Sequence, residues 1–326
     1  MAEMTLVEAV NLALARALAD DETVMVLGED VGRDGGVFRA TVDLIDRFGA
    51  ERVLDTPLAE TVIAGLSVGL AAQGLRPVAE IQFMGFIYPA IDQIVSHASR
   101  LRNRTRGRLT CPMVLRAPFG GGIHAPEHHS ESTEAMFAHI PGIKVVIPSS
   151  PARAYGLLLA AIRDPDPVVF LEPKRIYRSA KEEVEDSGEA MSLERCFVLR
   201  EGRDLTLVTW GAMTKECLEV AEHFAAQGSE VEVIDVAVLK PLDEATILDS
   251  VRRTGRCVIV HEAAYTGGFG AEIAARIAEH ALLSLLAPIR RVTGYDTIMP
   301  LPRTEHRYMP STARIAAAVR EVLDYR

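Results

Sequence analysis

The sequence has few cysteines, and their spacing is wide. Among 326 residues there are four, Cys111, Cys196, Cys217 and Cys257, and no two form a CxxC pair. A zinc ribbon or a dithiol redox site is therefore not indicated, and four buried thiols in a reducing compartment explain them. No stretch reaches the roughly 18 uninterrupted apolar residues of a membrane span. The opening segment, MAEMTLVEAV, lacks the basic and apolar parts of a signal peptide, so we expect a cytoplasmic protein that does not bind membranes.

Two common catalytic motifs and an excess of positive charge are also missing. There is no GxxxxGK[ST] phosphate loop and no HExxH zinc helix. Lys and Arg number 35 against 45 Asp and Glu, which gives a net charge of -10 and disfavours nucleic-acid binding. What is present is the composition of an ordinary globular protein, with 48% hydrophobic and 25% charged residues, and a length sufficient for two domains.

The first half of the chain alternates between strand and helix patterns. Thr5 and Glu8 form a capping box ahead of an apolar stripe, which predicts a helix to about residue 20. Short apolar, β-branched segments predict buried strands at residues 23–30, 76–83, 111–118, 143–148 and 167–173. Helical patterns lie at residues 60–73, 86–103, 132–139 and 151–163. This alternation predicts a parallel sheet covered by helices on both faces.

The second half repeats the alternation after a charged segment. KEEVEDSGEA, residues 181–190, lacks apolar periodicity and is expected to contain a linker. Strands are predicted at residues 205–211, 231–239, 257–263 and 289–294, and helices at 213–227, 244–253 and 271–280. The predicted fold class is therefore α/β, with two three-layer α/β/α domains at residues 1–182 and 191–326, joined by a linker at 183–190.

Three polar segments are candidates for a functional site. HAPEHHSES, residues 124–132, carries three of the nine histidines, which favours metal binding, proton transfer by one imidazole, or simply a solvated loop. Glu60 lies in the first turn of a helix built from small residues, where an acid is also favoured by the helix dipole alone. Glu29 and Asp30 follow a predicted strand and are either functional or turn residues.

Longer motifs carry a family resemblance over essentially the whole chain. GEDVGRDGGVFRAT, RVLDTPLAE, GLRPVAEIQF, DQIVSHASRLR, HHSES, HIPGIKVVIPSSP and DPDPVVFLEPKRIYR occur in this order. Together they closely resemble the β subunit of the thiamine-diphosphate-dependent decarboxylase component of 2-oxoacid dehydrogenase complexes, a family that includes pyruvate, branched-chain 2-oxoacid and acetoin enzymes. The resemblance implies a transketolase-like pyrimidine-binding domain followed by a transketolase C-terminal domain.

The resemblance also implies partners and cofactors. It implies an α2β2 heterotetramer that holds thiamine diphosphate at α–β interfaces, with the α subunit supplying the GDG…N motif for Mg²⁺ and the diphosphate. This sequence contains no GDG, which fits a chain that forms half of a site. The implied reaction is oxidative decarboxylation of a 2-oxoacid and reductive acylation of the lipoyl group of a dihydrolipoyl acyltransferase, whose lipoyl domain and core are further partners.

Four positions match residues that bind the cofactor in the family, and a fifth is expected to join them. Glu60 matches the acid that hydrogen-bonds the ring nitrogen of the aminopyrimidine, and the resemblance implies that it is catalytic. Phe86 matches an aromatic residue that stacks on the pyrimidine. Leu58 and Gln82 match other residues of that pocket, and Glu29 is expected to contribute to it.

The histidine segment and two turns match further family sites. His129 matches the histidine of an HSQS motif, which is associated with acyl transfer to the lipoyl group. Here Glu131 replaces the usual Gln and His128 precedes His129, so the roles of His128 and Glu131 stay open. Some members hold a structural potassium ion near segments that match residues 107–110 and 161–166. That match implies oxygen ligands at Ala161, Asp164 and Asp166.

Two rival functions differ from this reading. A transketolase-like synthase half would transfer two-carbon units and would need a phosphate-binding cluster, against which HHSES followed by PGIKVV speaks. A non-enzymatic subunit that only organises a partner would not need Glu60. Within the resembled family, an acetoin dehydrogenase β subunit is an alternative to the pyruvate and branched-chain types.

Overall fold

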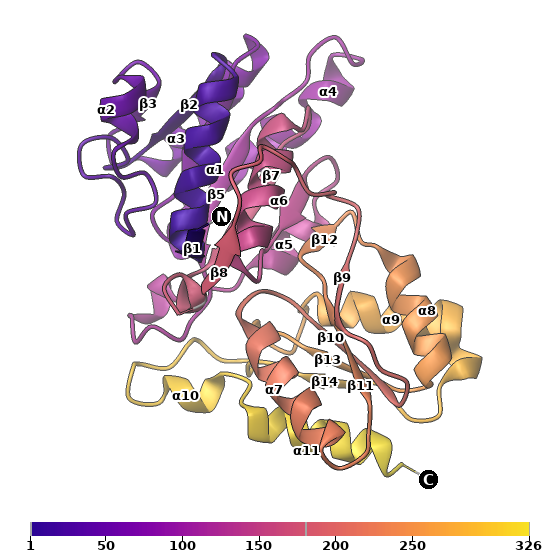
Figure 1. Cartoon of the computed structure of the whole chain (residues 1–326). Coiled ribbons are helices and arrows are strands. Elements are labelled where there is room, and N and C mark those ends of the chain that lie inside the picture. Colours follow the sequence, from indigo (N-terminus) through magenta and orange to yellow (C-terminus); the bar gives the residue numbers. More distant parts are fainter. Residues whose placement is uncertain (1, 180, 326) are drawn as a thin grey trace. The chain divides into compact units, whose positions relative to one another are not determined.

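The computed structural model describes residues 2–179 and 181–325 (Figure 1). The chain forms two compact units. The first comprises Met1–Phe119 and Met136–Leu193, and the second comprises Gly120–Ala135 and Glu194–Arg326. In the part of the chain that is described, no helix is both long and apolar enough to cross a bilayer.

The first unit is built on parallel strands. Their order across the sheet is β6-β7-β5-β4-β2-β3, and every neighbouring pair among them is parallel. The bounds are β2 Val24–Gly28, β3 Val53–Asp55, β4 Arg76–Glu80, β5 Val114–Phe119, β6 Lys144–Val146 and β7 Val168–Pro173. All six residues of β5 and all six of β7 are buried, as expected for strands covered on both faces.

Helices and a small ribbon complete this unit. Its main helices are α1 Leu6–Asp20, α2 Leu44–Phe48, α3 Glu60–Ala72 and α6 Pro151–Arg163, with α4 at Leu101–Arg104 and α5 at Glu134–His139. The predicted capping box of α1 is confirmed, because the Thr5 side chain accepts from the Glu8 amide while the Glu8 carboxylate accepts from the Thr5 amide. Helix α1 packs against α6, and β1 Ala2–Thr5 pairs antiparallel with β8 Lys181–Val184.

The prediction of one helix over residues 86–103 is wrong. The segment is broken into a 3₁₀ helix at Met84–Ala90, a π-helical turn at Gln93–His97, a second 3₁₀ turn at Ala98–Arg100 and the short helix α4. Pro89 explains the first break, because proline lacks the amide that a helix interior needs and clashes with the preceding turn.

The second unit has one sheet between two helix layers. Its strands are β9 Phe197–Arg200, β10 Leu205–Thr209, β11 Val231–Asp235, β13 Cys257–Val260 and β14 Arg290–Val292, in the order β14-β13-β10-β11-β9. Only β9 runs antiparallel to its neighbour within this described sheet. Helices α7 Thr214–Ala225 and α11 Thr312–Leu323 pack together, as do α8 Glu244–Thr254 and α9 Gly270–Ala281, and Figure 1 shows the two pairs on opposite faces. Shorter elements are β12 Val238–Lys240 and α10 Glu305–Tyr308.

The division into units differs from a simple cut of the chain. Residues 120–135, inside the domain predicted at 1–182, group with the second unit. The segment predicted as a linker, 183–190, is attached to the first unit, since β8 reaches Val184 and the Gly188 amide donates to the Tyr155 hydroxyl at 2.9 Å. Low apolar content in this segment therefore reflects an exposed strand end rather than a free connection. The boundaries at 182 and 191 stay a prediction.

Candidate functional site

Polar side chains gather where three neighbouring strands of the first unit end. Glu29 and Asp30 directly follow β2, Glu60 begins α3 just after β3, and Gln82 lies two residues after β4. The order β4-β2-β3 places these carboxyl ends side by side at one edge of the sheet, the usual location of sites in α/β folds. The Gln82 amide nitrogen donates to the Asp30 carboxylate at 3.3 Å. We call Glu29, Asp30, Glu60 and Gln82 the carboxylate edge.

Burial and neighbouring charges act on one carboxyl group of the carboxylate edge, that of Glu29. Burial raises the pKa of the Glu29 carboxyl, and the nearby charges of Asp30 and Glu60 raise it further. The same interaction shows that Glu29 and Glu60 lie within electrostatic reach of each other, as the sequence reasoning required for a shared pocket. Closely spaced carboxylates of this kind can hold and share a proton.

The loop that carries Glu29 and Asp30 is held by a residue to which sequence reasoning gave no role. Asp55, at the end of β3, accepts the amides of Gly32 at 2.6 Å and Arg33 at 3.1 Å. Its signal was its place in the motif RVLDTPLAE, directly after a strand. By tying the loop after β2 to the end of β3, Asp55 fixes the direction in which Glu29 and Asp30 leave the sheet.

The predicted apolar residues of this site differ in exposure. Phe86 is half-buried, and its ring packs edge-on to that of Phe83 with centroids 5.8 Å apart. Leu58 is 71% exposed, next to the start of α3. An aromatic face and an acidic edge therefore share one end of the sheet, while Leu58 contributes an apolar surface that this chain leaves uncovered.

A buried ion network lies beneath the same sheet edge, and sequence reasoning missed it. Arg116 on β5 pairs with Glu80 at the end of β4 and with both carboxylate oxygens of Glu172 on β7, at 2.7 and 2.8 Å. The Tyr177 hydroxyl donates to Glu172. Burial raises the pKa of Glu80, against the opposing charge of Arg116. The available sequence signal was the presence of charged residues inside apolar strand patterns. In the structure, these residues connect three strands just before the candidate site.

The predicted histidine segment belongs to a closed loop of the second unit. This histidine loop, residues 120–131, is closed by the Gly120 amide, which donates to the Glu131 carbonyl at 3.0 Å. A single 3₁₀ turn, Glu127–His129, carries the two adjacent histidines. His129 is half-buried and His128 is exposed, so the structure distinguishes the two imidazoles that the sequence places together.

Two buried glutamates hold the start of the histidine loop. Glu262 accepts the Gly121 amide at 3.0 Å, and Glu305 accepts the amides of Gly122 at 2.6 Å and His124 at 3.0 Å. The glutamate residues are 4% and 1% exposed. Hydrogen bonds to ionised acceptors are about twice as strong as neutral ones, so these contacts order the loop. Glycine is required at 120, where φ is +83° and an added Cβ would lie 2.5 Å from the Glu262 carboxylate.

A third buried glutamate follows the loop and contacts the single tryptophan. The Trp210 indole nitrogen donates to Glu134 at 3.2 Å, and the Trp210 ring stacks on His261 with centroids 5.0 Å apart. Burial raises the pKa of Glu134 to about 7. Burial also lowers the pKa of His261 to about 3, helped by the charge of Arg291, so that imidazole is neutral at physiological pH.

The structure also bears on the two predicted metal sites, one at the histidines and one for potassium. Among the described residues, no three side chains of His, Cys, Asp or Glu gather as metal ligands, so the histidine loop does not form such a site. At the predicted potassium site, the Asp164 carboxylate pairs with Lys144, and Asp166 pairs with Arg102 at 2.6 Å. The Ala161 carbonyl accepts the Asp164 amide at 3.3 Å. The Asp164 and Asp166 carboxylates therefore already pair with cationic side chains, and the potassium site stays a prediction.

Comparisons with known proteins agree over the full chain. The model of the transketolase pyrimidine-binding domain matches residues 2–180, and that of the transketolase C-terminal domain matches residues 195–315. The chain is 49% identical over 322 residues to the pyruvate dehydrogenase E1 component subunit beta of Acholeplasma laidlawii, covering 99% of this chain and 98% of that protein. It is 47% identical over 325 residues to the same subunit of Bacillus subtilis (strain 168), covering 100% of both.

A solved structure supports the fold independently. The chain superposes on a split-gene transketolase, described as an inactive beta4 tetramer, with a TM-score of 0.82 over 99% of both chains. The sequence identity is 24%, so this likeness concerns the fold alone. It confirms the predicted transketolase-like arrangement of two α/β domains.

Proposed function

This chain belongs to the β subunits of the decarboxylating component of 2-oxoacid dehydrogenase complexes, and we propose that it acts in that component with an α subunit and thiamine diphosphate. The proposed reaction decarboxylates a 2-oxoacid and transfers the acyl unit to the lipoyl group of an acyltransferase. Pyruvate is the first substrate to test, because relatives that are 47–49% identical over the whole chain carry that name. The observation that carries the proposal is the clustering of Glu60, Glu29 and Gln82 beside Phe86 at one sheet edge.

The carboxylate edge has the chemistry that an aminopyrimidine ring requires. Glu60 would share a proton between its carboxyl group and a ring nitrogen, and neighbouring Glu29, whose own pKa is raised by burial and by the charges of Asp30 and Glu60, would line the same pocket. Phe86 would pack against the face of the ring, and Gln82, oriented by Asp30, would offer an amide. When bound, the cofactor supplies the electron sink for decarboxylation. These residues therefore fit the pyrimidine end of thiamine diphosphate.

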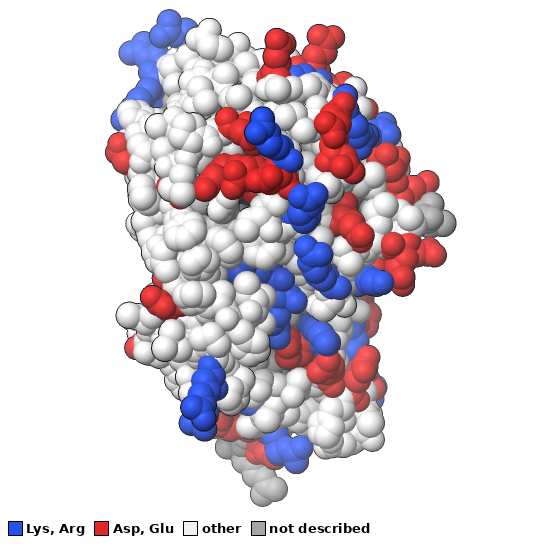
Figure 2. Space-filling model, turned by 90° about the vertical axis from the view of Figure 1, so that its left-hand side faces the viewer, with Lys and Arg blue, Asp and Glu red and all other residues white. Residues whose placement is uncertain are grey.

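The remainder of the cofactor site is proposed to come from the α subunit. The sequence contains no GDG motif, so Mg²⁺ and the diphosphate are assigned to the partner. Exposed apolar side chains at and before α3, namely Leu58, Val62 and Leu66, offer a surface for such a partner. One face of the molecule has a broad area with few charged side chains beside a region where both signs mix (Figure 2). A heterotetramer of two α and two β chains would cover surfaces of this type.

His129 is proposed to serve the second half-reaction. Its half-buried imidazole, on a loop held by Glu262 and Glu305, would protonate a lipoyl sulfur as the dithiolane opens. His128 is exposed and is assigned no chemical step. Loop order matters here because proton transfer requires the donor within hydrogen-bonding distance of the sulfur.

Reconstitution tests the proposal. The chain is purified alone and also co-expressed with an α subunit that carries a GDG…N motif, and thiamine diphosphate binding is measured by calorimetry with Mg²⁺. We expect weak binding and no turnover for the chain alone, and tight binding with dye-coupled decarboxylation of pyruvate for the heterotetramer. Tight binding and turnover without a second polypeptide would contradict the shared site. Faster turnover of branched-chain 2-oxoacids or acetoin would retain the family and overturn the choice of pyruvate.

A further inference from the structure

A row of four aromatic rings in the first unit ends at Phe86. The ring centroids of Tyr177 and Phe38 lie 5.2 Å apart, and those of Phe38 and Phe83 lie 5.3 Å apart. Phe83 and Phe86 follow at 5.8 Å. The last two pairs meet edge to face, at interplanar angles of 69° and 82°. An edge-to-face contact fixes the plane of one ring relative to the next, so the orientation of Phe86 is linked through Phe83 to that of Phe38. We call these four residues the aromatic row.

The far end of the aromatic row is fixed in the buried ion network. Tyr177 is 2% exposed, and its hydroxyl donates to Glu172, whose carboxylate also pairs with Arg116. Movement of the Tyr177 ring would break a buried hydrogen bond, and leaving a buried polar group without its partner is costly. Phe38, like Phe83 and Phe86, is half-buried. The row therefore leads from a rigid interior to the open carboxylate edge.

Phe38 is held in place by the loop that follows β2. The Asn11 side-chain amide donates to the carbonyls of Ala40 and Val42, at 3.0 Å each. The next residue after Phe38, Arg39, has a φ of +68°, in the left-handed region that residues other than glycine rarely adopt. Such a conformation persists only where surrounding contacts impose it. The backbone that carries the Phe38 ring is therefore fixed by the chain itself.

The same loop meets the segment after β4 at two points. The Gln82 amide nitrogen donates to the Asp30 carboxylate at 3.3 Å, and the next ring along, Phe83, packs on Phe38. The Phe86 amide in turn donates to the Phe83 carbonyl at 2.9 Å. One polar and one aromatic contact thus hold the turn that carries Phe86, and the aromatic contact is the one that reaches its ring.

We propose that Phe38 and Phe83 are positioning residues for the cofactor, which hold the Phe86 ring at the angle at which it packs against the aminopyrimidine. The inference rests on the proposed function, in which Phe86 meets that ring. A side chain that is already at its binding angle has less freedom to lose when the ligand arrives, so the affinity is higher. Phe38 acts through Phe83, and Phe83 acts through Phe86. Neither takes part in a chemical step.

Filling of apolar volume is the alternative role for Phe38 and Phe83. A leucine would then serve almost as well, because cores tolerate apolar replacements of similar size. The edge-to-face contacts favour positioning, since leucine has no ring plane through which an orientation could be passed on. The two roles also differ in how their losses combine. Effects of residues that do not act through each other usually add, whereas those of residues in one connected set do not.

A double-mutant cycle on Phe38 and Phe86 tests the proposal. Binding of thiamine diphosphate with Mg²⁺ is measured by calorimetry on the heterotetramer freed of cofactor. We expect Phe86→Leu to weaken binding about tenfold and Phe38→Leu about fivefold, while the double variant stays near tenfold because Phe38 acts only through Phe86. Phe38→Tyr keeps the ring and should bind like the wild type. With saturating cofactor, Phe38→Leu should change dye-coupled turnover less than about twofold, because it alters binding rather than the chemical step.

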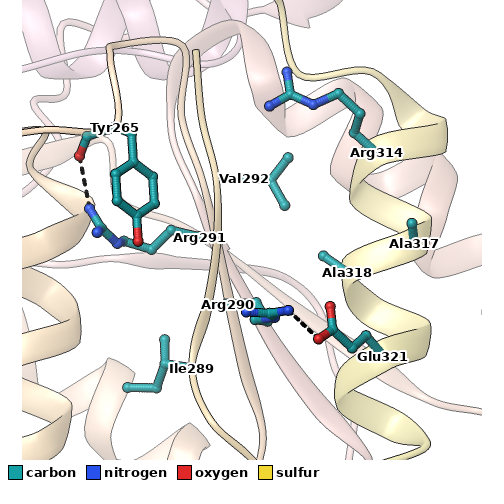
Figure 3. Close-up of a pocket in the computed structure, with 9 residues that line it drawn as sticks. All are labelled: Tyr265, Ile289, Arg290, Arg291, Val292, Arg314, Ala317, Ala318 and Glu321. Carbon is teal, nitrogen blue, oxygen red and sulfur yellow. Dashed lines mark hydrogen bonds and ion pairs between the residues drawn. The ribbon is translucent and has the colours of Figure 1, made fainter. Parts of the chain in front are cut away.

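Two aromatic residues outside the aromatic row provide matched controls. Phe48 is half-buried in the same unit, and the Arg47 guanidinium lies 5.0 Å from the centre of its ring. In the second unit, Tyr265 stacks on Arg291 at 3.8 Å, beside a surface pocket lined by β14 and α11 (Figure 3). Phe48→Leu and Tyr265→Leu each remove a ring contact and should leave the affinity for the cofactor unchanged.

The outcomes separate this inference from the function on which it rests. Wild-type affinity in Phe38→Leu, equal losses in Phe38→Leu and Phe48→Leu, or a double variant weakened about fiftyfold would overturn the positioning role and leave Phe86 in the cofactor site. Wild-type affinity in Phe86→Leu would remove Phe86 from that site, and would overturn both this inference and the proposed pocket. If Phe38→Leu does not assemble, the cycle is run with Phe83→Leu in its place, and the same results decide.

Discussion

The carboxylate edge and the histidine loop differ in how firmly the chain holds them in place. At the carboxylate edge the key groups are partly open to solvent, and Leu58 beside them is 71% exposed. In the histidine loop, the three amides of Gly121, Gly122 and His124 are bound by glutamates that are at most 4% exposed. The first region is open to solvent, whereas the second is ordered by hydrogen bonds within its own unit.

This difference separates two kinds of function. A site completed by a partner can leave its reacting groups loosely held until the partner and cofactor arrive. A group proposed to act on a mobile lipoyl arm should be positioned before the arm arrives, because a flexible arm cannot itself hold that group in place. The following changes should therefore affect the two regions differently.

The largest effect is expected from Glu60→Gln. This change keeps the shape of the side chain but removes the carboxyl group that would share a proton with the cofactor. Loss of that proton transfer should reduce dye-coupled decarboxylation by the heterotetramer at least about 100-fold, which corresponds to about 3 kcal/mol of barrier. Glu51→Gln, at an exposed position of the same unit, is the control and should retain activity. Turnover by Glu60→Gln within a few-fold of the wild type would remove Glu60 from the mechanism.

His129→Ala should separate the two half-reactions. Removal of a general acid at the lipoyl sulfur is expected to slow lipoyl-domain acylation about 100-fold, while dye-coupled decarboxylation changes little. His128→Ala serves as its control, since the exposed neighbouring imidazole should matter less in both assays. Equal losses in the two assays would instead indicate that His129 only orders the loop. A larger effect of His128→Ala would assign the proton transfer to His128 instead.

Glu305→Ala should give a smaller effect with the same pattern. It removes the acceptor of the Gly122 and His124 amides and leaves two donors without their charged partner, which loosens the histidine loop. We expect lipoyl acylation to fall about tenfold and decarboxylation to stay near the wild-type rate. Glu305→Gln should recover most of the activity, because its amide oxygen can still accept. A variant whose two activities fall together would show a general loss of folding rather than a loss of positioning.

Local features of the fold could be predicted from the sequence. The capping box at Thr5 and Glu8 fixes the start of α1, and the apolar β-branched segments mark β2, β5 and β7. These signals depend on residues a few positions apart in the sequence, so they can be recognised without knowing the tertiary structure. The pocket that Glu29 and Gln82 are expected to share came from the family resemblance, because both lie inside the strands predicted at 23–30 and 76–83.

Interactions between distant residues could not be predicted in this way. The Glu262 and Glu305 carboxylates bind amides 141 to 183 residues earlier in the chain, and no spacing or periodicity encodes such pairs. The same contacts explain why the histidine loop groups with the second unit. In the sequence, the Arg116 network is visible only as a charged residue within a predicted buried strand. Its partners on β4 and β7 are determined by the order of the strands in the sheet.

A separate effect, on stability rather than on activity, is expected from Glu134 and requires no catalysis. Its pKa is raised to about 7 by burial, whereas an unfolded glutamate titrates near 4.5. The folded state therefore binds a proton more tightly than the unfolded state between these values, and stability should fall by up to about 3 kcal/mol as pH rises from 4.5 to 7. The charge of Glu262 also raises the pKa of Glu134, whereas His261, which stacks on Trp210, has a pKa of about 3 and stays neutral over this range.

Trp210 makes this titration observable, because it is the only tryptophan and its indole nitrogen donates to Glu134. Ionisation of an acceptor so close to the indole should shift its emission, with a midpoint near pH 7. Glu134→Gln should abolish that shift and flatten the dependence of unfolding on pH, while Glu131→Gln, at a half-buried position of the same segment, should preserve both. If Trp210 emission is constant from pH 5 to 8 in the wild type, Glu134 does not change charge in this range. In that case the histidine loop is insensitive to pH from this side.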